Sequence, residues 1–161
     1  MALKGMDMND KLKIEKAMLK DNLLKLNKRQ LKMFYGILVH AWASKKAFIS
    51  TQNFFNLWRE LNELCYELDE EFPDPYYDHE ILKSFCHAHP YYFIDILEPE
   101  LVINLFCEHL TDRIGILATI AQKLHTGGLR AAYEYSNAVL NLTDDIDESI
   151  AQAEEHVKTF S

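Results

Sequence analysis

Acidic residues recur at helical spacing in two segments that lie far apart in the sequence. The first segment holds Glu60, Glu63 and Glu67, and the second holds Glu108 and Asp112. Carboxylates three or four positions apart share one face of a helix. Two such faces packed together could hold Mg²⁺ against a triphosphate, since this ion prefers oxygen ligands. On this interpretation the metal ligands are Glu60, Glu63, Glu108 and Asp112.

Over roughly 15 of the 161 residues, these two segments resemble the all-α nucleotide pyrophosphohydrolases of the MazG type. The motifs of that family read roughly E-E-x-x-E and E-x-x-D on two packed helices. Two positions depart from it, because Arg59 replaces an acid in the first motif and His109 replaces a glutamate in the second. The resemblance implies Mg²⁺-dependent hydrolysis of nucleoside triphosphates. Because the acidic quartet is incomplete, we predict no such activity and keep this enzyme as the alternative.

Cysteine and histidine also gather in two places, Cys86-His87-Ala88-His89 and Cys107-Glu108-His109. Zinc sites usually take their ligands as spaced pairs such as C-x₂₋₄-C, and neither place has that spacing. His109 also lacks the acidic neighbour expected after a phosphoacceptor histidine, because Leu110 follows it. No glycine-rich phosphate loop or Ser-His-Asp order is present. The sequence therefore predicts no catalytic residue, no metal and no cofactor.

Charge divides the chain sharply. Residues 1–46 hold eleven lysines and arginines against four acidic residues, whereas residues 47–161 hold six against twenty-one, and the net charge is −8. The basic segment is therefore expected to meet something acidic: the body of the protein, a second copy, a partner or a nucleic acid. Nucleic acid is disfavoured, since an acidic body repels phosphates. The alternative to such a contact is a lysine-coated helix that is simply solvated beside an acidic helical bundle.

An amphipathic basic helix is predicted in this segment, with leucines near one face and lysines over the others. We expect a partner to contact the helix through both kinds of side chain, with the apolar residues giving affinity and the charges setting register. Leu19 and Leu23 are the first residues to change in a test. The full set predicted to bind a partner is Leu12, Lys16, Leu19, Lys20, Leu23 and Leu26.

A long apolar stretch from Glu98-Pro99 to Gly127-Gly128 is expected at the centre of the fold. Proline suits the first position of a helix, and glycine closes its end. The stretch predicts a central helix at about 99–125, or two helices in line if Thr111 caps a second one. Residues 91–97 are strand-like in composition but have no partner strand, so they are expected to be an extended connector or part of a helix.

Apolar periodicity and capping residues predict a single all-α domain, a bundle of six or seven helices. Residues 1–8 are expected to be a disordered leader, and residues 9–46 a basic helical segment. Asn27 followed by Gln30 predicts a helix restart within that segment. The remaining helices are expected over about 50–72, 76–87, 129–140 and 143–160.

Three cysteines form an odd set that is typical of a reducing compartment. The sequence shows neither a membrane span nor a secretory signal. We therefore expect a cytoplasmic protein that contacts no membrane. The function predicted is that of a non-enzymatic helical module, an adaptor, antagonist or immunity-type inhibitor, that binds another protein. A homodimer and a nucleic-acid-binding regulator that uses the basic helix stay open as alternatives.

Overall fold

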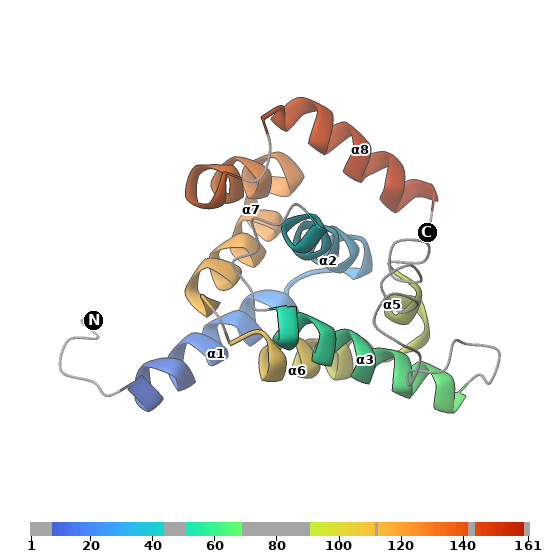
Figure 1. Cartoon of the computed structure of the whole chain (residues 1–161). Helices are drawn as coiled ribbons and strands as arrows, with labels where there is room; N and C mark the ends of the chain where they lie inside the picture. The colour runs from blue at the N-terminus through green and yellow to red at the C-terminus, as the bar shows by residue number, and fades with distance from the viewer. Residues whose placement is uncertain (1–7, 44–50, 69–90, 112, 142–143, 160–161) are drawn as a thin grey trace.

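The structure is a computed structural model of the chain, and it describes residues 8–43, 51–68, 91–111, 113–141 and 144–159. These residues form seven helices and no strand, which confirms the predicted all-α class (Figure 1). In chain order the helices are α1 (Met8–Leu24), α2 (Lys28–Ala43), α3 (Thr51–Leu68), α5 (Tyr92–Ile96), α6 (Pro99–His109), α7 (Ile114–Leu140) and α8 (Ile146–Thr159).

The predicted central helix is divided between α6 and α7. Helix α6 ends as the Leu110 amide donates to the carbonyl of Phe106 at 2.8 Å. Arg113 then adopts the left-handed conformation with φ 50° and ψ 41°, and α7 starts after it. A left-handed residue cannot continue a right-handed helix. The expectation of one unbroken helix over 99–125 is therefore wrong, and the residue before α7 is Arg113 rather than Thr111.

Helix α7 passes through the glycine pair that was expected to end a helix. Gly128 has φ 79° and ψ −170°, so it kinks the helix instead of stopping it. The helix then continues to Leu140, which gives α7 a length of 27 residues. The helix expected at 129–140 is thus the second half of α7.

Other predictions from the sequence concern single residues or short segments, and the structure can be compared with them one by one. Asn27 and Gln30 form the predicted capping box, since each backbone amide donates to the other side chain at 2.9 Å. Glu98 precedes α6 but makes no side-chain cap, and Pro99 takes the first position. Residues 92–96 form the short helix α5 rather than a connector. Of the leader expected at 1–8, residues 1–7 lie outside the described residues, whereas Met8 is the first residue of α1. The helix expected at 76–87 also lies outside the described residues.

Helix α2 lies in the middle of the bundle, between α8 on one side and α3 and α6 on the other (Figure 1). Its Tyr35 is fully buried, and the ring packs 4.7 Å from Phe93 of α5 and 6.2 Å from Phe106 of α6, measured between centroids. Helix α1 packs on α7 and α6, and α3 packs on α6. These contacts fix α3 against α6, which matters for the site described next.

None of the described helices combines the length and the apolar content that crossing a bilayer requires.

Candidate functional site

The packing of α3 on α6 brings the two acidic segments together. Helix α3 buries one face, with Phe54, Trp58 and Leu61 in the core, and this leaves Glu60 at the edge of the contact. Helix α6 buries Phe106 and ends at His109. The last turn of α6 therefore lies beside the middle of α3.

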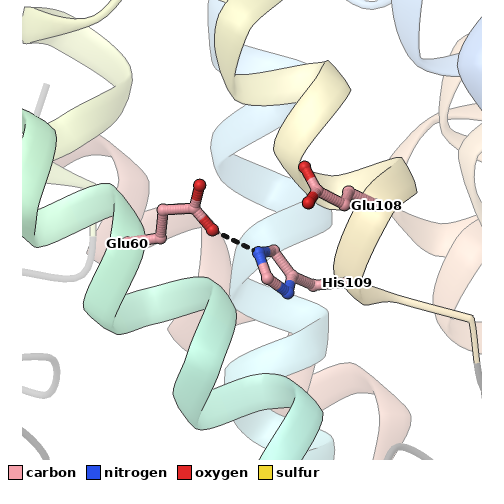
Figure 2. A group of neighbouring side chains, drawn as sticks. All are labelled: Glu60, Glu108 and His109. Atoms are coloured by element: carbon pink, nitrogen blue, oxygen red, sulfur yellow. Dashed lines mark hydrogen bonds and ion pairs between the residues drawn. The ribbon is translucent and has the colours of Figure 1, made fainter.

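Glu60, Glu108 and His109 converge at this contact (Figure 2). The Nε2 atom of His109 lies 2.5 Å from Oε2 of Glu60, and the two side chains are 19% and 41% exposed. Glu108 is exposed and comes from the same turn as His109. One ligand atom from each of the three side chains lies within 4.8 Å of the other two. A carboxylate from α3 thus meets a carboxylate and an imidazole from α6.

An open hollow of about 370 Å³ adjoins this cluster. Glu63 lines the hollow together with Glu60 and His109, whereas Glu67 is exposed near the end of α3. The rest of the lining is made by Asn56, Arg59 and Leu64. Of the four carboxylates that the sequence proposed as metal ligands, Glu60 and Glu108 lie in the cluster and Glu63 lies beside it. Asp112 lies outside the described residues.

The thiols near the site are protonated at ordinary pH. Burial raises the pKa of Cys107 to about 11, although Lys20 and Lys16 act in the opposite direction. Burial likewise raises the pKa of Cys65 to about 12. A protonated, buried thiol is a poor nucleophile and a poor metal ligand, so both cysteines serve as core residues. Cys86 and its neighbouring histidines lie outside the described residues.

Of the residues predicted to bind a partner, three lie in the core and three are partly buried beside it. Leu19 and Leu23 have no exposed surface, and Leu26 is also buried. Their apolar face packs within the chain's own bundle, because α1 lies against α7 and α6. Leu12, Lys16 and Lys20 are partly buried beside it. The leucines therefore anchor α1 in the fold, and they offer no free surface to a partner.

A different set of α1 side chains faces solvent. Met18 is 52% exposed and Leu24 is 49% exposed, and Lys11 is exposed as well, as is Lys25, which directly follows the helix. Steps of seven residues place Lys11, Met18 and Lys25 along one line, and Leu24 lies about 100° around the helix axis from Lys25. We call these four residues the α1 outer face. Among the described residues, no ion pair joins a lysine of α1 to an acidic residue of another helix.

Sequence reasoning missed two features of these sites. It treated His109 as a departure from an enzyme motif, and it did not foresee that this ring would meet Glu60 forty-nine residues earlier in the chain. It also assigned binding to the apolar side of α1. The signal for the outer face was present, since Met18 and Leu24 fall off the stripe of buried leucines.

Comparison with protein-family models, with curated proteins and with solved structures gave no match for this chain.

Proposed function

We propose that this chain is a non-enzymatic helical module that binds another protein, in the manner of an adaptor, an antagonist or an immunity-type inhibitor. The observation that carries the proposal is the α1 outer face. It combines two exposed apolar side chains, Met18 and Leu24, with Lys11 near the start of α1 and Lys25 directly after its end. The apolar pair supplies contact area, and the lysines select an acidic surface and set the register of the contact.

The partner surface is acidic on this proposal. Lys28 and Arg29 extend the positive charge beyond α1 into the start of α2, and both are exposed. Asp21 is the exposed acid between Met18 and Leu24, and it gives the face an asymmetric charge pattern. Such a pattern favours one orientation of a partner over others. A second copy could supply the acidic surface from α8, where Asp147 and Glu148 are exposed.

Native affinity capture with matched charge variants tests the proposal. We expect the double variant Lys11→Glu/Lys25→Glu to keep its fold, because surface substitutions usually change stability by less than about 0.5 kcal/mol. It should lose a protein that the unchanged chain retains, and Met18→Ser should weaken that retention. The matched control is Lys123→Glu, which reverses an exposed lysine of α7. The proposal fails if Lys11→Glu/Lys25→Glu and Met18→Ser retain the same proteins as the unchanged chain and as the Lys123→Glu control.

Two further arms separate the alternatives. Sedimentation of the purified chain reports a homodimer directly, and the dimer should dissociate in the Lys11→Glu/Lys25→Glu variant if α8 is the acidic partner. Nuclease treatment before capture separates protein from nucleic acid. A retained species that disappears with nuclease and with salt would favour the nucleic-acid-binding regulator, whose affinity falls steeply as salt rises.

One observation favours a Mg²⁺-dependent nucleotide pyrophosphohydrolase as the second candidate. Glu60 and Glu63 line one hollow on α3, as two ligands of that enzyme would. Arg59 and His109 line the same hollow, and they dilute the negative charge that would hold Mg²⁺ there. We expect no pyrophosphate release with Mg²⁺ or Mn²⁺. Release that is lost in both Glu63→Gln and Asp112→Asn would establish the enzyme instead.

A further inference from the structure

We propose that Glu60, Glu108 and His109 form a binding site for a zinc-type divalent ion, which joins α3 to α6. This inference goes beyond the proposed function, because the site shares no residue with the α1 outer face. It rests on three ligand atoms from two packed helices that lie within 4.8 Å of one another.

The distances suit a metal after small side-chain movements. Zinc binds imidazole nitrogen and carboxylate oxygen at about 2.0–2.2 Å, so two ligands of one tetrahedral ion lie about 3–3.5 Å apart. The Glu60 and His109 atoms, now 2.5 Å apart, must separate slightly to admit the ion. Glu108 must approach, and its exposure leaves its rotamer free to change.

The kinds of ligand select the ion. Imidazole suits zinc and the later first-row metals, whereas Mg²⁺ prefers oxygen ligands in an octahedral shell. A set of two carboxylates and one imidazole also neutralises the charge of a divalent ion. The hollow next to His109 leaves a fourth position open to water. Three protein ligands with one open position are the usual arrangement of an accessible zinc site.

The charges of the same cluster also favour a cation at this place. Glu60 and Glu108 approach each other from different helices within the acidic part of the chain, which carries six basic against twenty-one acidic residues. Like charges at this separation repel, and their partly exposed setting screens them only in part. Arg59, the nearest cation along α3, lines the hollow rather than the cluster. A divalent ion removes this repulsion and stabilises the contact between the two helices.

Isothermal titration of the purified full chain with ZnCl₂ and with MgCl₂ tests the site. We expect one zinc ion per chain and much weaker binding of magnesium. Zinc should also raise the thermal unfolding midpoint, because an ion that binds only the folded state stabilises it by mass action. Co²⁺ should give the visible absorption of a low-coordinate nitrogen and oxygen site. These readouts are independent of any activity or protein partner.

Matched variants locate the ion. Glu60→Gln and His109→Gln should each weaken zinc binding more than about 10-fold, since even a supporting residue of a metal site is worth that much. Glu108→Gln should weaken it as well. Glu63 and Glu67 lie on α3 outside the cluster, so the variants Glu63→Gln and Glu67→Gln should bind zinc as the unchanged chain does. Circular dichroism checks that each variant keeps its helices.

Three results would overturn the inference. The first is the absence of zinc binding, the second is equal affinity for zinc and magnesium, and the third is zinc binding that survives the double variant Glu60→Gln/His109→Gln. In the third case, loss of binding after thiol alkylation would assign the ion to cysteine instead. Failure of the α1 capture experiment leaves this site untouched, so the two proposals are tested separately.

Discussion

Buried polar side chains in this core have partners at Lys32 and at Ser136. The side chain of Lys32 is almost fully buried, and its ammonium donates to Asp95 of α5 at 3.1 Å, which ties α2 to α5. The hydroxyl of Ser136 donates to the Ala132 carbonyl one turn earlier at 2.7 Å. Such partners offset the cost of removing a polar group from water. Asn62 is the contrasting case.

Asn62 is 1% exposed, and neither its Nδ2 nor its Oδ1 atom finds a hydrogen-bond partner in the described structure. A buried polar group without a partner costs about 1–3 kcal/mol, and a leucine of similar shape removes that cost. We therefore expect Asn62→Leu to raise the free energy of unfolding by about 1–3 kcal/mol. Urea denaturation measures it. A lower urea midpoint in Asn62→Leu would mean that the amide is satisfied, for instance by an ordered water.

His40 of α2 gives the fold a dependence on pH. Burial lowers the pKa of this ring below its ordinary value of 6.5, and its Nδ1 lies 3.3 Å from the hydroxyl of Tyr133. Below pH 6.5 the unfolded chain therefore binds the proton before the folded chain does, so stability falls as the pH falls. The stability that the neutral His40 ring contributes is fully present above pH 6.5, where the ring is neutral in both the folded and the unfolded chain.

We expect His40→Gln, which is polar but does not titrate, to lose part of this dependence. The measurement compares urea midpoints between about pH 7.5 and pH 5.5, the window in which histidine titrates. The unchanged chain should lose more stability over that window than His40→Gln does. Equal slopes for the two proteins would show that His40 titrates alike in the folded and unfolded states.

At the scale of elements, α2 and α5 approach closely where Gly36 faces Tyr91. A Cβ atom at Gly36 would lie 2.8 Å from the hydroxyl oxygen of Tyr91 and 3.8 Å from the ring carbon that bears it. Alanine gains about 1 kcal/mol over glycine inside a helix. Overpacking against a buried ring costs about 1–3 kcal/mol, so the clash outweighs the gain.

Gly36→Ala should therefore lower the free energy of unfolding by about 1–2 kcal/mol, which thermal or urea denaturation measures. The decisive comparison is the same substitution in a Tyr91→Phe background. Without the hydroxyl, the nearest remaining atom is at ordinary contact distance, so Gly36→Ala should be neutral or stabilising there. An equal loss in both backgrounds would contradict the close approach.

Two of the three glycines of α7 have opposite roles. Gly128 adopts φ 79° and ψ −170°, a region that essentially only glycine occupies, so Gly128→Ala should cost about 1–3 kcal/mol. Gly115 lies at the start of α7, and an added Cβ there meets only the carboxylate of Glu15 at 3.7 Å. Gly115→Ala should thus stabilise by up to about 1 kcal/mol. A urea midpoint that does not fall in Gly128→Ala would exclude a kink fixed by Gly128, and one that falls in Gly115→Ala would contradict the open space at that position.

Most helices could be predicted from the sequence because helix formation depends on local signals. The periodicity of the leucines in α1 and the Asn27 to Gln30 capping box each involve residues within a few turns. The break between α6 and α7 was not predicted as a certainty, because Arg113 takes a left-handed conformation that its residue type does not signal. The contact of Glu60 with His109 depends on how α3 packs on α6. Sequence periodicity predicts which face of each helix is apolar, but it does not predict how two helices are aligned when they pack together.

At the scale of the whole molecule, the division of charge between the two parts of the chain lies on the surface and not in the core. Helix α1 contributes leucines to the interior on one side and lysines to solvent on the other. Its Asn22 side chain also donates to the Ala118 carbonyl of α7 at 2.9 Å, which fixes the two helices in register. The basic segment is therefore a structural part of the bundle, and its charged side is separate from that role.

This separation predicts two different effects from substitutions two residues apart. Leu23 is fully buried, so Leu23→Ala should cost about 2–5 kcal/mol of unfolding free energy, as large-to-small changes in packed cores do. Lys25 is exposed, so Lys25→Glu should change stability by less than about 0.5 kcal/mol. Urea denaturation measures both.

Deletion of residues 1–26 extends the same argument to the whole helix. It removes Leu19, Leu23 and Leu26 together and uncovers the face of α7 on which α1 packs. Because a small domain has only about 5–15 kcal/mol of net stability, losing three core leucines should abolish cooperative unfolding. A truncated chain that still unfolds in one sharp transition would show that α1 is an appendage. Partner binding must therefore be tested with Lys11→Glu/Lys25→Glu in the full chain, since loss of binding after truncation would report only an unfolded bundle.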